Sequence, residues 1–171
     1  MPPPKITHGL SYSEFQALAR TTPEKRIDYV AVLACAGLTP SELHGIVGRD
    51  YDHFQKDLRV GGRSARTIPV HPVVARILLK RATTIRPGEP LFPRWHNIQR
   101  QLPALCERAR VPPITAKDLQ VSFLRWLAEA RVPEGIAREL VGRGSSRLVV
   151  EVYRSASNRD LRAAISRLPI Q

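Results

Sequence analysis

The sequence is poor in cysteine and has no long apolar run. Its two cysteines, Cys35 and Cys106, stand far apart in apolar surroundings. We therefore expect buried free thiols rather than a disulfide framework or a cysteine-based metal site. No apolar run approaches membrane-spanning length, and the first residues, MPPPKITHGLSY, lack the apolar core of a signal peptide. These absences predict a cytoplasmic protein with no metal, no cofactor and no membrane contact.

Lysine and acidic residues are also scarce, whereas arginine is abundant. Of the 27 basic residues, 22 are arginine and five are lysine, against 15 acidic residues, which gives a net charge of +12. The stretch from Arg76 to Arg110 alone holds eight basic and two acidic residues. This balance favours a polyanionic partner, because the planar guanidinium group can bind two phosphate oxygens at once. An arginine-rich amino-acid usage throughout the genome is the alternative explanation.

The length and composition predict one domain. A chain of 171 residues with 43% hydrophobic content can bury one core. Residues 1–9 are expected to form an extended arm, and residues 10–171 a single domain without a separate N-terminal one.

Helix and strand signals alternate along this domain. Capping boxes predict helix starts after Ser11, Thr39 and Thr115, and Gly37 is expected to end the helix that begins near Pro23. The remaining predicted elements are strands at 58–60 and 66–70, helices at about 71–84, 95–109 and 136–141, a short helix leading to Tyr153, and a last helix after Ser157. The expected fold class is mainly α with a small antiparallel β-sheet (α+β).

Several short strings resemble the catalytic domain of the tyrosine recombinase (phage integrase) family. The strings are Gly37-Leu38-Thr39-Pro40-Ser41-Glu42-Leu43, Arg66-x-x-Pro69, Leu91-Phe92-Pro93, Lys117-Asp118-Leu119-Gln120, Leu140-Val141-Gly142-Arg143 and the isolated Tyr153. The resemblance extends from about Leu10 to Leu168. It implies the catalytic-domain fold of that family, in which a tyrosine attacks a DNA phosphodiester.

The scaffold residues of these strings match the family, but most of the chemical residues do not. Thr39 stands at the position of the family's first arginine, and Gly61 at the position of its lysine. The family's remaining chemical positions hold Lys117, Gln120, Val121 and either Arg143 or Gly144. Phosphoryl transfer needs fixed cations beside the phosphate and an acid for the leaving oxygen, and arginine is a poor acid. The resemblance therefore implies that Tyr153 is a vestigial nucleophile and that no catalytic residue remains.

Binding to duplex DNA does not need those residues, because it rests on many separate phosphate contacts. We predict a DNA-binding, nucleoid-associated structural or regulatory factor without enzyme activity. Its predicted DNA-binding residues are Arg59, Arg63, Arg66, Arg94, Arg100, Lys117, Gln120, Arg143 and Arg147.

Two other hypotheses remain open. One is a divergent active recombinase that uses Tyr153 with relocated partners. The other is an interaction module that docks on an active recombinase, or on a second copy of this chain, through its C-terminal helix. That helix can equally fold back on its own core, where Leu161, Ala164, Ile165 and Leu168 would form the buried face.

Overall fold

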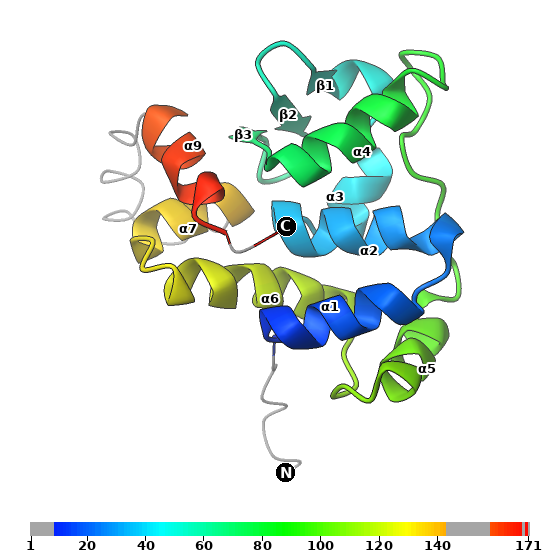
Figure 1. Cartoon of the computed structure of the whole chain (residues 1–171). Coiled ribbons are helices and arrows are strands. Elements are labelled where there is room, and N and C mark those ends of the chain that lie inside the picture. Colours follow the sequence, from blue (N-terminus) through cyan, green and yellow to red (C-terminus); the bar gives the residue numbers. More distant parts are fainter. Residues whose placement is uncertain (1–8, 143–157, 169, 171) are drawn as a thin grey trace.

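The computed structural model describes residues 9–142, 158–168 and 170. Eight α-helices, a short 3-10 helix at Gly48–Asp50 and three strands lie in these residues (Figure 1). The helices are α1 (Tyr12–Thr21), α2 (Glu24–Ala36), α3 (Pro40–Gly45), α4 (Pro72–Ala82), α5 (Ile98–Ala109), α6 (Ala116–Glu129), α7 (Glu134–Val141) and α9 (Asn158–Ser166). The strands are β1 (Tyr51–Asp52), β2 (Asp57–Val60) and β3 (Arg66–Pro69). The predicted fold class is therefore confirmed.

Helix α2 is the centre of the core. Every residue from Tyr29 to Ala36 is buried, because this part of the helix is apolar on all sides and is covered on all sides. Figure 1 shows α4 and the sheet on one side of α2 and α6 with α1 on the other. On the α6 side, Trp126 is fully buried and meets Tyr12 and Phe15 edge-on, with ring centroids 5.8 and 5.2 Å away.

The sheet is a small antiparallel meander in the order β1-β2-β3. In the β2–β3 hairpin, Leu58 pairs with Ile68 and Val60 with Arg66, so residues 61–65 form the turn. Gly62 has a φ of +88°, a backbone conformation that glycine adopts without strain. The alternation of side chains buries Leu58 and Val60 and leaves Arg59 on the outer face.

Most predicted helix boundaries hold. Ser11 and Thr39 each form a capping box, with Glu14 and Glu42 respectively, and Gly37 ends α2 in the left-handed conformation. Helix α5 begins at Ile98 rather than near Trp95, because Trp95 turns into the core before the helix starts. The helix predicted to carry Tyr153 lies outside the described residues.

Helix α9 folds back on the chain's own core. Ala164, Ile165 and Leu168 are buried, and α9 packs against α7 and β3 (Figure 1). Arg162 adds an ion pair to Asp57 at the start of β2, with 2.6 Å between Nη2 and Oδ1. Of the two arrangements considered for the C-terminal helix, the structure has the intramolecular one.

Residues before α1 are tied to α6. The Leu10 amide donates to Ser122 Oγ at 2.8 Å, and the Leu10 carbonyl accepts from Trp126 Nε1 at 3.0 Å. The predicted arm, residues 1–9, lies outside the described residues except for Gly9.

The two cysteines are buried free thiols, as predicted, and burial raises the pKa of Cys35 to about 12. Burial also raises the pKa of Cys106, so neither cysteine is a reactive thiolate near neutral pH. Within the described residues, no helix has both the length and the apolarity to cross a membrane, and no cluster of three or more His, Cys, Asp or Glu side chains could hold a metal ion.

Candidate nucleic-acid interface

A hollow of about 450 Å³ separates the first turn of α3 from the turn of the β2–β3 hairpin. We call it the hairpin hollow. It brings together Thr39 and Gly61, the two positions that the resemblance assigns to an arginine and a lysine. Its lining residues are Thr39, Ser41, Glu42, Gly45, Gly61, Gly62, Arg63 and Ser64. Among the described residues that line it, Arg63 is the one basic residue, so these residues offer mostly hydroxyl and backbone groups.

The Thr39 side chain belongs to the cap of α3. Its hydroxyl donates to Glu42 Oε2 at 3.0 Å and accepts from the Glu42 amide at 3.3 Å. The Thr39 amide donates to the same carboxylate at 2.8 Å. The prediction that this position serves as a helix cap is confirmed. These bonds hold the loop after α2 without help from any bound phosphate.

The position of Arg66 corrects its predicted role as a DNA contact. Its side chain is only 9% exposed and forms an ion pair with Glu42, with 2.6 Å between Nη1 and Oε1. Its Nε also donates to the Leu140 carbonyl at 2.8 Å. The guanidinium is directed inward because three elements meet there: β3, α3 and the end of α7. Arg66 therefore stabilises the fold rather than facing a partner.

This ion pair also sets the protonation of Glu42. Burial alone would raise its pKa, but the hydrogen bond from Arg66 and the cap amide outweigh burial, so the pKa lies below its usual 4.5. A side chain at Gly142 would collide with this pair, since a Cβ built there lies 2.5 Å from Arg66 Nη1. Gly142 also has a φ of +73°, which suits glycine at the end of α7.

Gln120 likewise differs from its predicted role. It is 1% exposed, and its Nε2 donates to the Gly37 carbonyl at 2.7 Å. It cannot reach an external phosphate from there. A neutral amide can be buried once it is hydrogen-bonded, whereas a charged side chain in the same place would be costly. Gln120 therefore anchors the loop that carries Thr39.

We expect Gln120→Ala to lower the free energy of unfolding by about 2 kcal/mol, because it leaves the buried Gly37 carbonyl unpaired and opens a cavity. Urea unfolding measures this change. The matched control is Lys117→Ala on the exposed side of α6, which should change stability by less than about 0.5 kcal/mol. Equal effects of the two substitutions would contradict the anchoring role.

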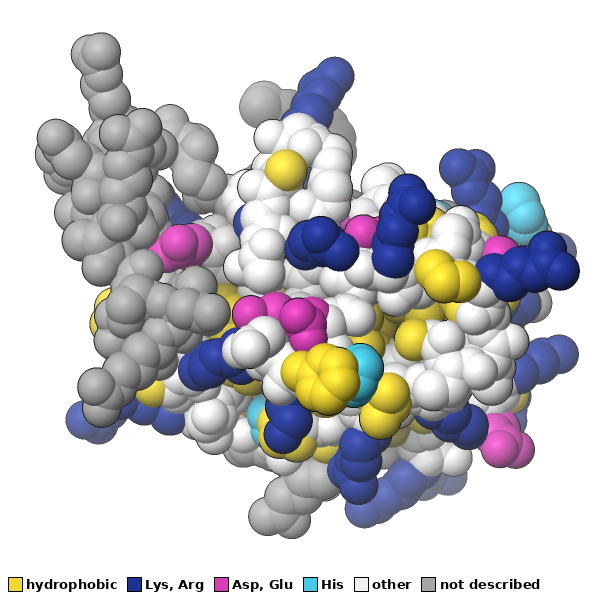
Figure 2. Space-filling model, turned by 90° about the horizontal axis from the view of Figure 1, so that it is seen from above, with side chains coloured by type: hydrophobic (Ala, Val, Ile, Leu, Met, Phe, Trp, Pro, Cys, Tyr) yellow, Lys and Arg dark blue, Asp and Glu magenta, His cyan; other side chains and the backbone are white. Residues whose placement is uncertain are grey.

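The other predicted contacts that the structure describes are exposed. They are Arg59, Arg63, Arg94, Arg100 and Lys117. Arg59 Nη2 donates to the Arg49 carbonyl at 2.7 Å, which directs its guanidinium along the outer face of the sheet. Arg143, Arg147 and Tyr153 lie outside the described residues. Figure 2, which looks onto the side of the sheet and α4, shows Lys and Arg side chains spread over this face with fewer acidic ones among them.

A histidine lies close to this basic surface. The Tyr29 hydroxyl and His44 Nε2 are 2.7 Å apart, and burial, together with the charges of Arg94 and His96, lowers the pKa of His44. Burial raises the pKa of Tyr29 to about 12. Both groups are therefore neutral at pH 7 and add no charge to the surface.

Sequence reasoning missed two features of the surface. Phe54, in the turn between β1 and β2, is 84% exposed and packs on His53 with ring centroids 3.9 Å apart. Three basic residues from α2 and α5 also surround a second hollow, which is described below. No local pattern indicates either feature, since a turn residue gives no periodic signal and the hollow joins distant segments.

Comparison with solved structures identifies the fold. The integrase of mycobacterium phage Brujita superposes with a TM-score of 0.79 over 98% of this chain, at 23% sequence identity. The chain has the tyrosine recombinase catalytic-domain fold. The XerA recombinase gives a TM-score of 0.69 at 18% identity, and the Tn1549 transposon integrase in complex with transposon right end DNA gives 0.68 at 18%.

This recombinase-like domain is shorter than the proteins it resembles. It spans 60% of the Brujita integrase chain and 67% of the XerA chain. No protein-family model matches the sequence, and no curated protein matches it. The likeness is thus one of fold, and in that fold the hairpin hollow lies between the two elements that hold Thr39 and Gly61.

Proposed function

We propose that this recombinase-like domain binds duplex DNA through phosphate contacts of its exposed cations, Arg63 of the hairpin hollow among them, and does not cut it. It acts as a structural or regulatory factor on DNA. The exposed cations Arg59, Arg63, Arg94, Arg100 and Lys117 supply the contacts, with Arg143 and Arg147 as further candidates from the sequence. A net charge of +12 attracts the duplex from a distance.

One observation carries the proposal of inactivity. Three of the described residues at the family's chemical positions offer no cation to a phosphate, and among the described positions Lys117 is the exposed cation that remains. Thr39 caps α3, Gly61 has no side chain, and Gln120 is buried against the Gly37 carbonyl. Transition-state charge on a phosphoryl group needs cations held in place, and one such arginine changes rates by about a thousandfold or more.

Covalent trapping tests the inactivity. The substrates are nicked duplexes with a randomised central region, from which the short cleaved fragment dissociates. Because the fragment is lost, an active recombinase cannot rejoin the strand and accumulates a covalent phosphotyrosyl complex, which a denaturing gel detects. We expect no such complex from the wild-type chain under conditions where it binds the same duplexes. A covalent band that disappears in Tyr153→Phe would instead support the divergent-recombinase hypothesis.

The hypothesis that this chain docks on an active recombinase through its C-terminal helix has less support. The apolar side of α9 is occupied by the chain's own core, since Ala164, Ile165 and Leu168 are buried there. A trans interaction through this face would first require α9 to leave the domain and would break the Arg162–Asp57 ion pair. Binding to duplex DNA in the absence of any other protein separates the two hypotheses.

A further inference from the structure

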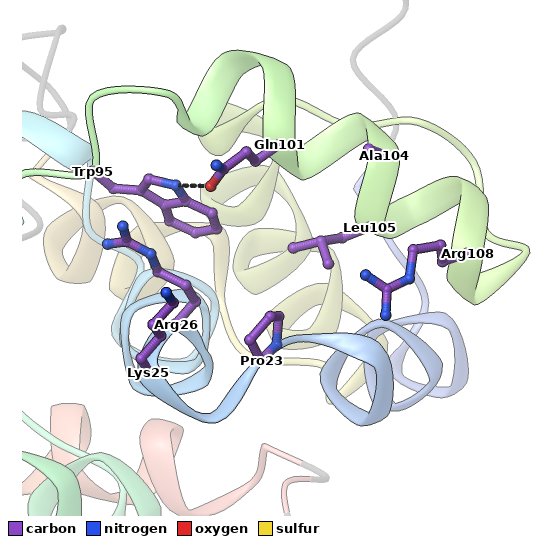
Figure 3. A pocket seen from close by; sticks show the side chains of 8 residues that line it. All are labelled: Pro23, Lys25, Arg26, Trp95, Gln101, Ala104, Leu105 and Arg108. Atoms are coloured by element: carbon purple, nitrogen blue, oxygen red, sulfur yellow. Dashed lines mark hydrogen bonds between the residues drawn. The ribbon is translucent and has the colours of Figure 1, made fainter.

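A second hollow, of about 310 Å³, lies between the first turn of α2 and the outer side of α5. We call it the α2–α5 hollow. Figure 3 shows Arg26 with Trp95 on one side of it and Arg108 on the opposite side, with Gln101 and Leu105 between them. The α2–α5 hollow and the hairpin hollow lie at opposite ends of α2: the first turn of this 13-residue helix lines the former, and its last residue leads into the loop with Thr39, which lines the latter. At about 1.5 Å per residue, that separation is roughly 20 Å.

The lining of this hollow is cationic without acidic compensation. Lys25, Arg26 and Arg108 all line it, and none of the described residues in the lining carries a carboxylate. The ion pairs of the described residues involve none of these three side chains. These three cations come from two helices and surround one concavity, so a single ligand can contact all of them. On an ordinary basic surface the side chains point apart into the solvent.

Two further contacts orient the hydrogen-bond donors that line the hollow. The Arg26 guanidinium lies over the Trp95 ring, 4.8 Å from its centroid, which restrains the cation by a cation–π contact. Trp95 Nε1 donates to Gln101 Oε1 at 2.6 Å. Because the indole N–H can only donate, the Gln101 oxygen faces it, and the amide nitrogen is left to donate to a ligand. Every polar side chain of the lining thus offers donors.

We propose that the α2–α5 hollow binds a terminal phosphate group carried on an organic body of about nucleotide size. A phosphate monoester carries close to two negative charges and three acceptor oxygens, which suits three cations spread over two helices. A single carboxylate would need only one of the arginines. The apolar wall of Pro23, Ala104 and Leu105, and a volume near the lower end of ligand pockets, leave room for more than the phosphate alone.

A free nucleotide and the 5′-phosphorylated end of a DNA strand both carry this group. The site does not depend on the hairpin hollow, so it can exist whether or not that hollow faces duplex DNA. Its occupancy can be measured without any DNA.

The two tryptophans give a direct measurement. Trp95 lines the hollow, whereas Trp126 is fully buried elsewhere and donates to the Leu10 carbonyl, so a ¹H–¹⁵N spectrum holds one reporter and one internal reference. Titration with adenosine 5′-monophosphate should move the Trp95 indole signal in a saturable way and leave the Trp126 signal in place. Adenosine, which lacks the phosphate, should move neither.

Matched variants assign the site. Arg108→Gln should raise the Kd for adenosine 5′-monophosphate about tenfold, because a charge-assisted contact is lost. Arg20→Gln removes the same charge from an exposed residue outside the hollow and should leave the Kd unchanged. An unshifted Trp126 signal in each variant confirms that the fold is intact.

Short duplexes with and without a 5′-phosphate distinguish the two sources. If only the phosphorylated duplex moves the Trp95 signal, the strand end is the ligand and the proposal holds. A Trp95 signal that no phosphate-bearing probe moves overturns the proposal. So does a signal that adenosine or the unphosphorylated duplex moves equally, or an equal effect of Arg108→Gln and Arg20→Gln.

Discussion

Glu42→Gln is expected to lower the free energy of unfolding by about 3 kcal/mol. The substitution leaves the Arg66 guanidinium, which is 9% exposed, without its anionic partner in a site closed by β3, α3 and α7. Removing one partner of a buried ion pair costs this much because the remaining charge is neither solvated nor paired. It also weakens the cap of α3, since the Thr39 amide donates to the same carboxylate. Denaturant unfolding at pH 7 measures the change.

The control for this prediction is an exposed ion pair of the same kind. Arg125 and Glu129 lie one turn apart on α6, with side chains 46% and 51% exposed. Glu129→Gln should cost less than about 1 kcal/mol, because solvent screens such pairs. If Glu42→Gln were as mild as Glu129→Gln, Arg66 would have a solvated alternative position and its assignment to the fold would be wrong.

The same pair predicts a pH dependence. The pKa of Glu42 in the folded protein lies below its ordinary value of 4.5, so the unfolded chain takes up a proton on Glu42 first as the pH falls. The stabilisation from Glu42 is fully present above its unfolded pKa and is lost as the pH falls through the folded pKa. The stability difference between wild type and Glu42→Gln should therefore shrink below about pH 4.5. A difference that stays constant down to pH 3 would show that the charge of Glu42 contributes nothing.

Loss of two exposed cations, one in the lining of the hairpin hollow and one on α6, should weaken duplex binding about a hundredfold. The variant is Arg63→Gln with Lys117→Gln: Arg63 lines the hollow and Lys117 is exposed on the first turn of α6. Each lost phosphate contact should lower the affinity roughly tenfold at moderate salt, and it should reduce the slope of log K against log salt by about one. Fluorescence anisotropy with a mixed-sequence duplex measures both quantities.

A second pair of substitutions controls for net charge. Arg20→Gln with Arg86→Gln removes the same two charges from exposed residues away from the hairpin hollow. It should reduce affinity only a few-fold through the weaker overall field. Similar losses in the two double variants would mean that the whole surface attracts DNA and that the hollow is no particular contact site.

The fold was predictable from the sequence because its signals are local. Capping boxes at Ser11 and Thr39 and the left-handed Gly37 depend on residues within one turn of each other, so the spacing alone predicts them. Short strings such as Gly37 to Leu43 and Arg66-x-x-Pro69 then fixed the resemblance, and the comparisons confirm the fold that it implied.

The candidate site was less predictable because it depends on which way long side chains turn. Arg66 and Gln120 were expected to face a phosphate, yet each bonds to a backbone carbonyl more than 70 residues away in the chain, at Leu140 and Gly37. Such bonds form only once α2, α6 and α7 have packed. Periodicity places a residue on a face of its element but does not show what that face meets. The α2–α5 hollow was missed for the same reason.

The most direct test of duplex binding is its dependence on salt. The observed association constant of the wild-type chain for a short mixed-sequence duplex should fall steeply between 50 and 200 mM salt, by about a hundredfold or more if five exposed cations contact phosphates. The slope of log K against log salt counts those contacts. No binding at the lowest salt, or binding that salt does not change, would contradict the conclusion that this domain holds DNA by its phosphates.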